Sequence, residues 1–144
     1  MTAPIQLEGF QFDSPSGFRT EEVTVGLRFG LPGSGPAPSF ILQSKAARAG
    51  AKFEDLVSET MVELAHTVSN IKNLTNSEIT FADGGKGAVL AYNFPTGAGD
   101  MRQYFVMRLH KGRLANVTLT LPQSALTESN AQSFMKAISS LKAV

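Results

Sequence analysis

Residues 101–121, with the sequence MRQYFVMRLHKGRLANVTLTL, decide the fold. Two runs rich in β-forming residues, 101–110 and 114–121, are separated by little more than Lys111-Gly112, a break typical of a hairpin turn. Strands that follow one another this directly pair antiparallel, because a parallel pair needs a long crossover connection. The stretch therefore predicts two neighbouring strands of an antiparallel sheet.

Alternation of apolar and polar side chains predicts more strands before this hairpin. It is clearest at Val23, Val25, Leu27 and Phe29, where every second residue is apolar, as in a half-buried strand. Turns rich in glycine and proline separate the β-rich segments from one another. The strands expected on these grounds cover residues 7–12, 21–29, 39–45, 78–81 and 88–94.

Two segments, 52–69 and 127–141, have the three- and four-residue apolar spacing of amphipathic helices. In the first, Glu54 and Asp55 would lie in the opening turn, where acidic side chains oppose the positive end of the helix dipole. The second is expected to bury a stripe of side chains, Ala131, Phe134, Met135, Ile138 and Leu141. The chain is thus predicted to be an α+β protein, a single domain over residues 1–144 in which two principal helices pack on an antiparallel sheet of about six to seven strands.

Several predicted strands carry apolar side chains on both faces. Val89 and Ala91 alternate with Leu90 and Tyr92, and residues 104–109 show the same pattern. Two apolar faces need two covers, and two helices packed on opposite faces would provide them. The alternative is that part of one face is left open for a partner, because exposed apolar patches mark interaction sites.

The composition excludes several classes of protein. The 144 residues include no cysteine, which rules out disulfides, thiolate metal sites and a cysteine nucleophile. The 13 basic and 12 acidic residues are interspersed, so neither nucleic acid nor anionic lipid is indicated as a partner. The first ten residues lack the basic start and apolar core of a secretory signal, and no apolar run is long enough to span a membrane. We therefore expect a cytoplasmic protein without direct membrane insertion.

No constellation of residues predicts catalysis. His66 and His110 are isolated, and neither has a second histidine at a spacing that would share a metal. The glycine-rich turns are followed by prolines or a strand, whereas a phosphate-binding loop opens a helix. An enzyme would need a pocket that gathers residues such as Arg102, Tyr104 and His110. We expect a protein that is not an enzyme and has no cofactor, metal ion or catalytic residue.

The order of the predicted elements and several short segments resemble the DcrB-like family, whose fold is shared with the PsbP photosystem subunits. The segments that carry the resemblance are GFRTEEVTV (17–25), PSFIL (38–42), FEDLV (53–57), AVLAY (88–92), RQYF (102–105) and FMKAISSL (134–141). They extend over nearly the whole chain. The resemblance implies a PsbP-like sandwich.

Secreted members of that family carry a signal and often a lipidated cysteine, neither of which this sequence has, so the chain resembles the cytoplasmic branch. That branch is similar to the effector-associated (Eag) chaperones of bacterial type VI secretion, which shield the N-terminal transmembrane helices of an effector until it is loaded on the secretion spike. The resemblance implies a chaperone whose partner is an effector protein with N-terminal apolar helices. A homodimer is a further expectation.

An apolar groove would let such a protein cover an apolar helix. The side chains expected to line it are Val23, Val25, Ile41, Leu64, Val68, Tyr104 and Val106. Val23 and Val25 correspond by position to an apolar pair in the family's second strand, and the others follow from the face on which each is expected to lie. Each of them could equally be ordinary core. Two alternative functions stay open, a carrier that encloses a small apolar ligand and a generic protein-interaction module of the same fold.

Overall fold

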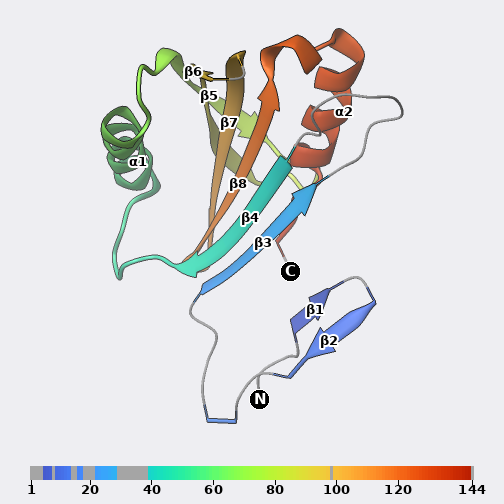
Figure 1. Cartoon of the computed structure of the whole chain (residues 1–144). Coiled ribbons are helices and arrows are strands. Elements are labelled where there is room, and N and C mark those ends of the chain that lie inside the picture. Colours follow the sequence, from blue (N-terminus) through green and yellow to red (C-terminus); the bar gives the residue numbers. More distant parts are fainter. Residues whose placement is uncertain are drawn as a thin grey trace.

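A computed structural model of the chain describes residues 5–7, 9–13, 16–17, 22–28, 39–97 and 99–143. They form a six-stranded antiparallel sheet with two principal helices, which agrees with the predicted α+β class. Figure 1 shows one helix on each side of this sheet and a small hairpin apart from it. The predicted strand over residues 21–29 is described only from Glu22 to Arg28, and the segment rich in glycine and proline at residues 30–38 lies outside the described residues.

The main sheet consists of β3 (Glu22–Arg28), β4 (Ser39–Ala46), β5 (Lys72–Thr80), β6 (Lys86–Thr96), β7 (Gly99–His110) and β8 (Arg113–Pro122). The strand order is β3-β4-β8-β7-β6-β5, and every neighbouring pair is antiparallel. Between β7 and β8, Lys111 and Gly112 have φ angles of 48° and 76°, as the tight hairpin turn predicted at this position requires. The decisive stretch of sequence therefore forms two neighbouring strands as expected.

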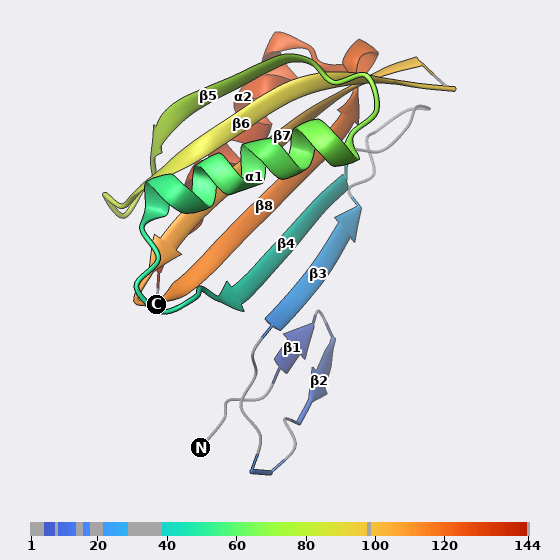
Figure 2. The same cartoon turned by 90° about the vertical axis from the view of Figure 1, so that its left-hand side faces the viewer.

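Helix α1 (Phe53–Thr67) and helix α2 (Glu128–Ser139) lie on opposite faces of the sheet, as Figures 1 and 2 show. A 3₁₀ turn, η1 (Gln123–Ala125), connects β8 to α2. The Thr127 hydroxyl caps α2 by accepting a hydrogen bond from the Asn130 N–H at 3.1 Å. Both predicted helices are confirmed, and each covers a different face. No helix of the described ranges is long and apolar enough to cross a membrane.

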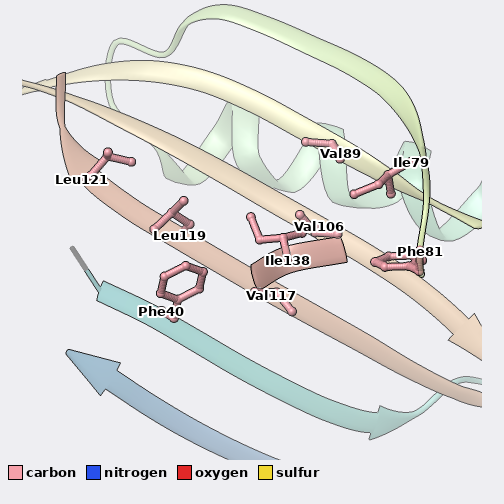
Figure 3. Close-up of a cluster of buried hydrophobic side chains, with 9 residues drawn as sticks. All are labelled: Phe40, Ile79, Phe81, Val89, Val106, Val117, Leu119, Leu121 and Ile138. Carbon is pink, nitrogen blue, oxygen red and sulfur yellow. The ribbon is translucent and has the colours of Figure 1, made fainter. Parts of the chain in front are cut away.

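Each helix covers its own cluster of buried apolar side chains. Leu56 and Val57 of α1 pack with Leu90, Met107 and Leu114 of the sheet. On the other face, α2 contributes Ile138 to the cluster drawn in Figure 3, which also contains Phe40, Ile79, Phe81, Val89, Val106, Val117, Leu119 and Leu121. Burial on both faces explains why the central strands are apolar at successive positions.

A polar cluster ties the turn between β5 and β6 to the end of α2. The Asp83 carboxylate accepts hydrogen bonds from the Arg108 guanidinium at 2.8 Å and from the N–H groups of Gly85 and Ala143 at 3.0 and 3.1 Å. Arg108 also donates to the Leu141 carbonyl oxygen at 2.8 Å. The hydrogen bond from Arg108, with those from the two N–H groups, holds the pKa of Asp83 well below its ordinary value.

The prediction of a single strand over residues 7–12 is wrong. The described residues there form a hairpin of two short strands, β1 (Ile5–Leu7) and β2 (Phe10–Phe12). Gly9 lies in its turn with a φ of 79°, a left-handed conformation that favours glycine. The hairpin is a two-stranded sheet of its own and is not part of the main sheet.

Two smaller predictions also need correction. β5 begins at Lys72 rather than near residue 78, because its polar first half is held by pairing with β6 and not by any apolar pattern of its own. Met135 is 36% exposed and is therefore not part of the buried stripe of α2.

Candidate functional site

β3 is an edge strand with one apolar side. In its register with β4, Val25 lies opposite Leu42 and Leu27 lies opposite Phe40, which places this side of β3 on the face that carries α2. Val23 points to the same face because side chains alternate along a strand. The other side of β3 carries Glu22, Thr24, Gly26 and Arg28.

Helix α2 does not bury this part of the sheet. The buried cluster between α2 and the sheet has nine residues, and none of them comes from β3 (Figure 3). Val23 and Val25 are half-buried, and Leu27 is 41% exposed. With two neighbours they form a continuous surface that we call the apolar strip, which consists of Val23, Val25, Leu27, Leu42 and Leu141.

The apolar strip is hollowed. A hollow of about 170 Å³ lies between Leu27 and the C-terminal end of α2, and a second of about 160 Å³ lies beside Val23 and Val25. Leu42 and Leu141 line both hollows, which therefore adjoin one another. Such a surface can receive side chains of a partner rather than only touch them.

Apart from Ile41, the opposite face of this region is largely polar and does not extend the strip. The Gln43 amide donates a hydrogen bond to Glu22 on the edge strand. Toward the centre of the sheet, Gln103 donates to the Thr120 hydroxyl at 2.8 Å and accepts a hydrogen bond from Tyr92. Burial raises the pKa of Tyr92 to about 12, so its hydroxyl remains protonated and able to donate. An apolar partner therefore has one suitable face at this edge, the face that carries α2.

The structure divides the seven predicted groove residues between the two sides of the sheet. Those on the α2 face are Val23, Val25, Tyr104 and Val106, and those on the α1 side are Ile41, Leu64 and Val68. Val106 is fully buried, and Tyr104 packs against the same cluster with the Arg102 guanidinium 5.0 Å from its ring centre. These two residues therefore belong to the core beneath α2.

The three residues on the α1 side do not form a second apolar groove. Ile41 lies on β4 and is 47% exposed. Val68 lies at the end of α1, where its N–H donates a hydrogen bond to the Leu64 carbonyl oxygen at 2.9 Å. Leu64 lines a hollow of about 310 Å³ whose other side chains are mostly polar. In that hollow Asn116 is only 6% exposed, and its Oδ1 has no hydrogen-bond partner in the described structure. Only Val23 and Val25 of the predicted set lie in the apolar strip.

Three residues of the strip were not predicted as site residues. Leu27 continues the alternation of Val23 and Val25, so the strand pattern itself could have identified it. Leu42 likewise lies two residues after the buried Phe40 and therefore on the same face of β4. Leu141 follows the end of α2, and its neighbours come from β4 and β8, which no local pattern brings together.

The described residues assemble neither a metal cluster nor the pocket of Arg102, Tyr104 and His110 that an enzyme would need. They contain no group of three or more histidine or acidic side chains placed to hold a metal ion. Arg102 and Tyr104 adjoin each other, but His110 follows Arg102 by eight positions on the same strand. That separation is roughly 26 Å at about 3.3 Å per residue. The three residues do not converge on one pocket.

The comparisons with known proteins identify the fold alone. No family model and no curated protein matches this chain. A crystal structure of PA94 from Pseudomonas aeruginosa, a protein of unknown function suggested to be a regulator, is similar to it with a TM-score of 0.77. The match covers 99% of this chain and 96% of that chain at 16% sequence identity. The two proteins therefore share an overall architecture.

Proposed function

We propose that the chain is a chaperone without enzymatic activity that binds the apolar, transmembrane-type helices of a secretion effector before the effector is loaded. The observation that carries the proposal is the apolar strip, whose most exposed member is Leu27 on an edge strand. The resemblance of the sequence to the Eag chaperones suggests the partner class, an effector of the type VI secretion spike with N-terminal apolar helices.

The chemistry of the strip suits a helical partner. An apolar helix in water aggregates unless its side chains are covered, but its backbone hydrogen bonds are already satisfied within the helix. A binding surface therefore needs to supply only apolar contacts. The seven residues of β3 span roughly 20 Å at about 3.3 Å per residue, the length of about 13 helical residues. The strip can thus contact three to four turns of a helix.

The size of the hollows favours a protein partner over an enclosed ligand. Pockets for small ligands typically measure about 300–1,000 Å³ and bury most of the ligand surface. The two adjoining hollows of the strip measure about 170 and 160 Å³, so even together they reach only the lower end of this range. A small apolar molecule would therefore stay largely exposed there, whereas a helix would cover the strip along its length.

Co-purification with a fragment that carries two apolar helices of a candidate effector tests the proposal. We expect the wild-type chain to keep the fragment in solution. Val25→Asp should lose the fragment, because it places a carboxylate in the middle of the strip without a partner. Thr24→Asp is the matched control, since Thr24 is exposed on the other side of the same strand and should tolerate the same change.

Circular dichroism establishes that each variant is folded before the results are compared. A folded wild-type chain that fails to bind the fragment would show that the proposal is wrong. Equal loss of binding in Val25→Asp and Thr24→Asp would show that the helix binds elsewhere. A lipid or other apolar molecule found in the purified protein by mass spectrometry would support the ligand-carrier alternative.

A further inference from the structure

A polar hollow of about 310 Å³ lies on the face of the sheet opposite the apolar strip. Its walls are the second half of α1, which lies in front of the sheet in Figure 2, and the strands β4, β7 and β8. The volume falls at the lower end of the range for small-molecule sites, about 300–1,000 Å³. Unlike the strip, this hollow is a single space between a helix and the sheet, and polar side chains line most of it.

Asn116 lines this hollow and has a buried atom that lacks a partner. The residue is 6% exposed, and its Oδ1 has no hydrogen-bond partner among the described residues. The large majority of buried polar side chains in proteins are hydrogen-bonded, so this exception points to a group from outside the chain. One water molecule occupies about 30 Å³, roughly a tenth of the hollow. The space is therefore large enough for a molecule that supplies the missing donor.

The neighbouring hydrogen bonds determine which atom of Asn116 is left unpaired. The Glu22 carboxylate can only accept hydrogen bonds, so Gln43 presents its NH₂ group to Glu22 and its oxygen to Asn116. Asn116 in turn donates through Nδ2 to the Gln43 oxygen at 3.2 Å. What Asn116 offers to the hollow is therefore an acceptor, and a ligand must bring a donor.

The other polar groups on α1 are acceptors as well. The hydroxyl groups of Thr60 and Thr67 donate to the Leu56 and Glu63 carbonyl oxygens at 2.8 and 2.9 Å, which leaves the two hydroxyl oxygens able to accept. The Glu63 carboxylate adds acceptor oxygens and a negative charge. A primary ammonium group, with three N–H donors and a positive charge, suits this set.

The remaining lining residues indicate the rest of the ligand. Lys45 is the one cation among the described residues that line the hollow, and it can pair with a carboxylate. Leu64, Phe105 and Leu114 provide an apolar surface. Because the charges of Lys45 and Glu63 cancel, the hollow suits a zwitterion with an apolar side chain.

We propose that this hollow binds a small amino acid with an apolar side chain. Its ammonium group donates to Asn116 Oδ1 and faces Glu63, and its carboxylate faces Lys45. Its side chain packs against Phe105 and Leu114. The hollow and the apolar strip lie on opposite faces of the sheet, so this site does not depend on the proposed function.

Isothermal titration calorimetry with three related probes tests the proposal. L-Leucine has the ammonium group, the carboxylate and an apolar side chain, whereas 3-methylbutylamine lacks the carboxylate and N-acetyl-L-leucine lacks the ammonium group. We expect the wild-type chain to bind leucine, and to bind 3-methylbutylamine roughly fivefold more weakly. N-acetyl-L-leucine should not bind measurably, because it has lost the positive charge and most of the donors.

Asn116→Leu removes the buried acceptor with little change in side-chain volume. Leucine binding should fall at least about tenfold, because the ammonium group loses its buried partner. Asn93→Leu is the matched control, since Asn93 bonds to Arg102 on β7 at 3.1 Å and is not among the described residues that line the hollow. It should leave leucine binding unchanged, and circular dichroism establishes that both variants are folded.

Two substitutions of exposed residues distinguish the two ends of the ligand. Glu63→Gln should weaken leucine and 3-methylbutylamine alike, each roughly fivefold, because both carry the ammonium group. Lys45→Gln should weaken leucine by a similar factor and leave 3-methylbutylamine unchanged, because that probe has no carboxylate. Neither exposed side chain is part of a buried cluster, so both variants should fold even where Asn116→Leu does not.

A folded wild-type chain that binds none of the three probes would overturn the proposal, since the hollow would then hold only water. Equal loss of leucine binding in Asn116→Leu and Asn93→Leu would show that Asn116 is not the partner of the ammonium group. Weaker binding of 3-methylbutylamine by Lys45→Gln would overturn the orientation of the ligand. The titrations contain no helix fragment, so their failure leaves the proposed function untouched.

Discussion

The two edges of the sheet are built differently. β5 shifts its register between Lys72 and Thr75, and Asn73 has a φ of 56°, so the outer ladder of this strand is interrupted. β3 is regular over its whole described length. β5 buries Ile79 beneath α2, whereas β3 buries none of its side chains. The comparison teaches that one edge is interrupted by an irregularity and anchored in the core, while the other is regular and keeps its apolar side outside the buried cluster.

The largest expected effect is a difference between the two edge strands in how much a truncated side chain lowers the free energy of unfolding. Ile79→Ala on β5 should lower the free energy of unfolding by about 2–4 kcal/mol, because Ile79 is 9% exposed and packs under α2. Val25→Ala on β3 should lower it by less than about 1 kcal/mol in the monomer, because that side chain remains partly in water. Urea unfolding at low protein concentration measures both values. Equal losses would show that β3 is anchored as firmly as β5.

A smaller effect tests how the end of β5 is fixed. Asp83→Asn removes the charge that faces Arg108 and should lower stability at neutral pH. The pKa of Asp83 is depressed in the folded state, so its contribution is complete above the ordinary aspartate pKa of about 3.9 and is lost as the pH falls toward the folded value. The difference between wild type and variant in urea unfolding should therefore shrink between pH 5 and acidic pH. A difference that does not change with pH would mean that the charge contributes nothing.

The smallest expected effect concerns the surface of the β5 edge. Lys86 and Glu78 form an ion pair of 3.2 Å between β6 and β5, and both side chains are about two-thirds exposed. Lys86→Ala should change the free energy of unfolding by less than about 0.5 kcal/mol, because exposed ion pairs are screened by water. Thermal unfolding at low and high salt measures the change. A larger loss would mean that this ion pair, rather than the packing of Ile79, fixes the β5 edge.

Local sequence patterns predicted most strands and helices of the fold. They did not predict the segments that become strands only by pairing with a neighbour. The alternation at Val23 and Val25 predicted β3 and the face on which each side chain lies, because both follow from the geometry of a single strand. The polar first half of β5 has no such pattern and becomes a strand only by pairing with β6. The turn at Gly9 was overlooked because the residues on either side of it both have strand character.

The candidate site was harder to predict than the fold. Val25 and Val106 lie on the same face, and both occur in alternating strands, yet only Val106 is covered by α2. What separates them is the position of the helix relative to the strand order, which depends on contacts between distant parts of the chain. The polar face opposite the strip was missed for the same reason, since Gln43 and Asn116 become neighbours only when β4 pairs with β8.

The place of β4 in the sheet also determines when the apolar strip can form. β4 lies beside β8, with Phe40 opposite Leu119, so this pairing closes a long loop of chain. Closing such a loop costs conformational entropy and slows folding, whereas β5 to β8 are joined by short turns and can assemble early. β4, together with β3, can join the sheet only after β8 has formed, because β4 pairs with β8. A newly synthesised chain therefore completes the apolar strip last, after the rest of its own sheet has formed.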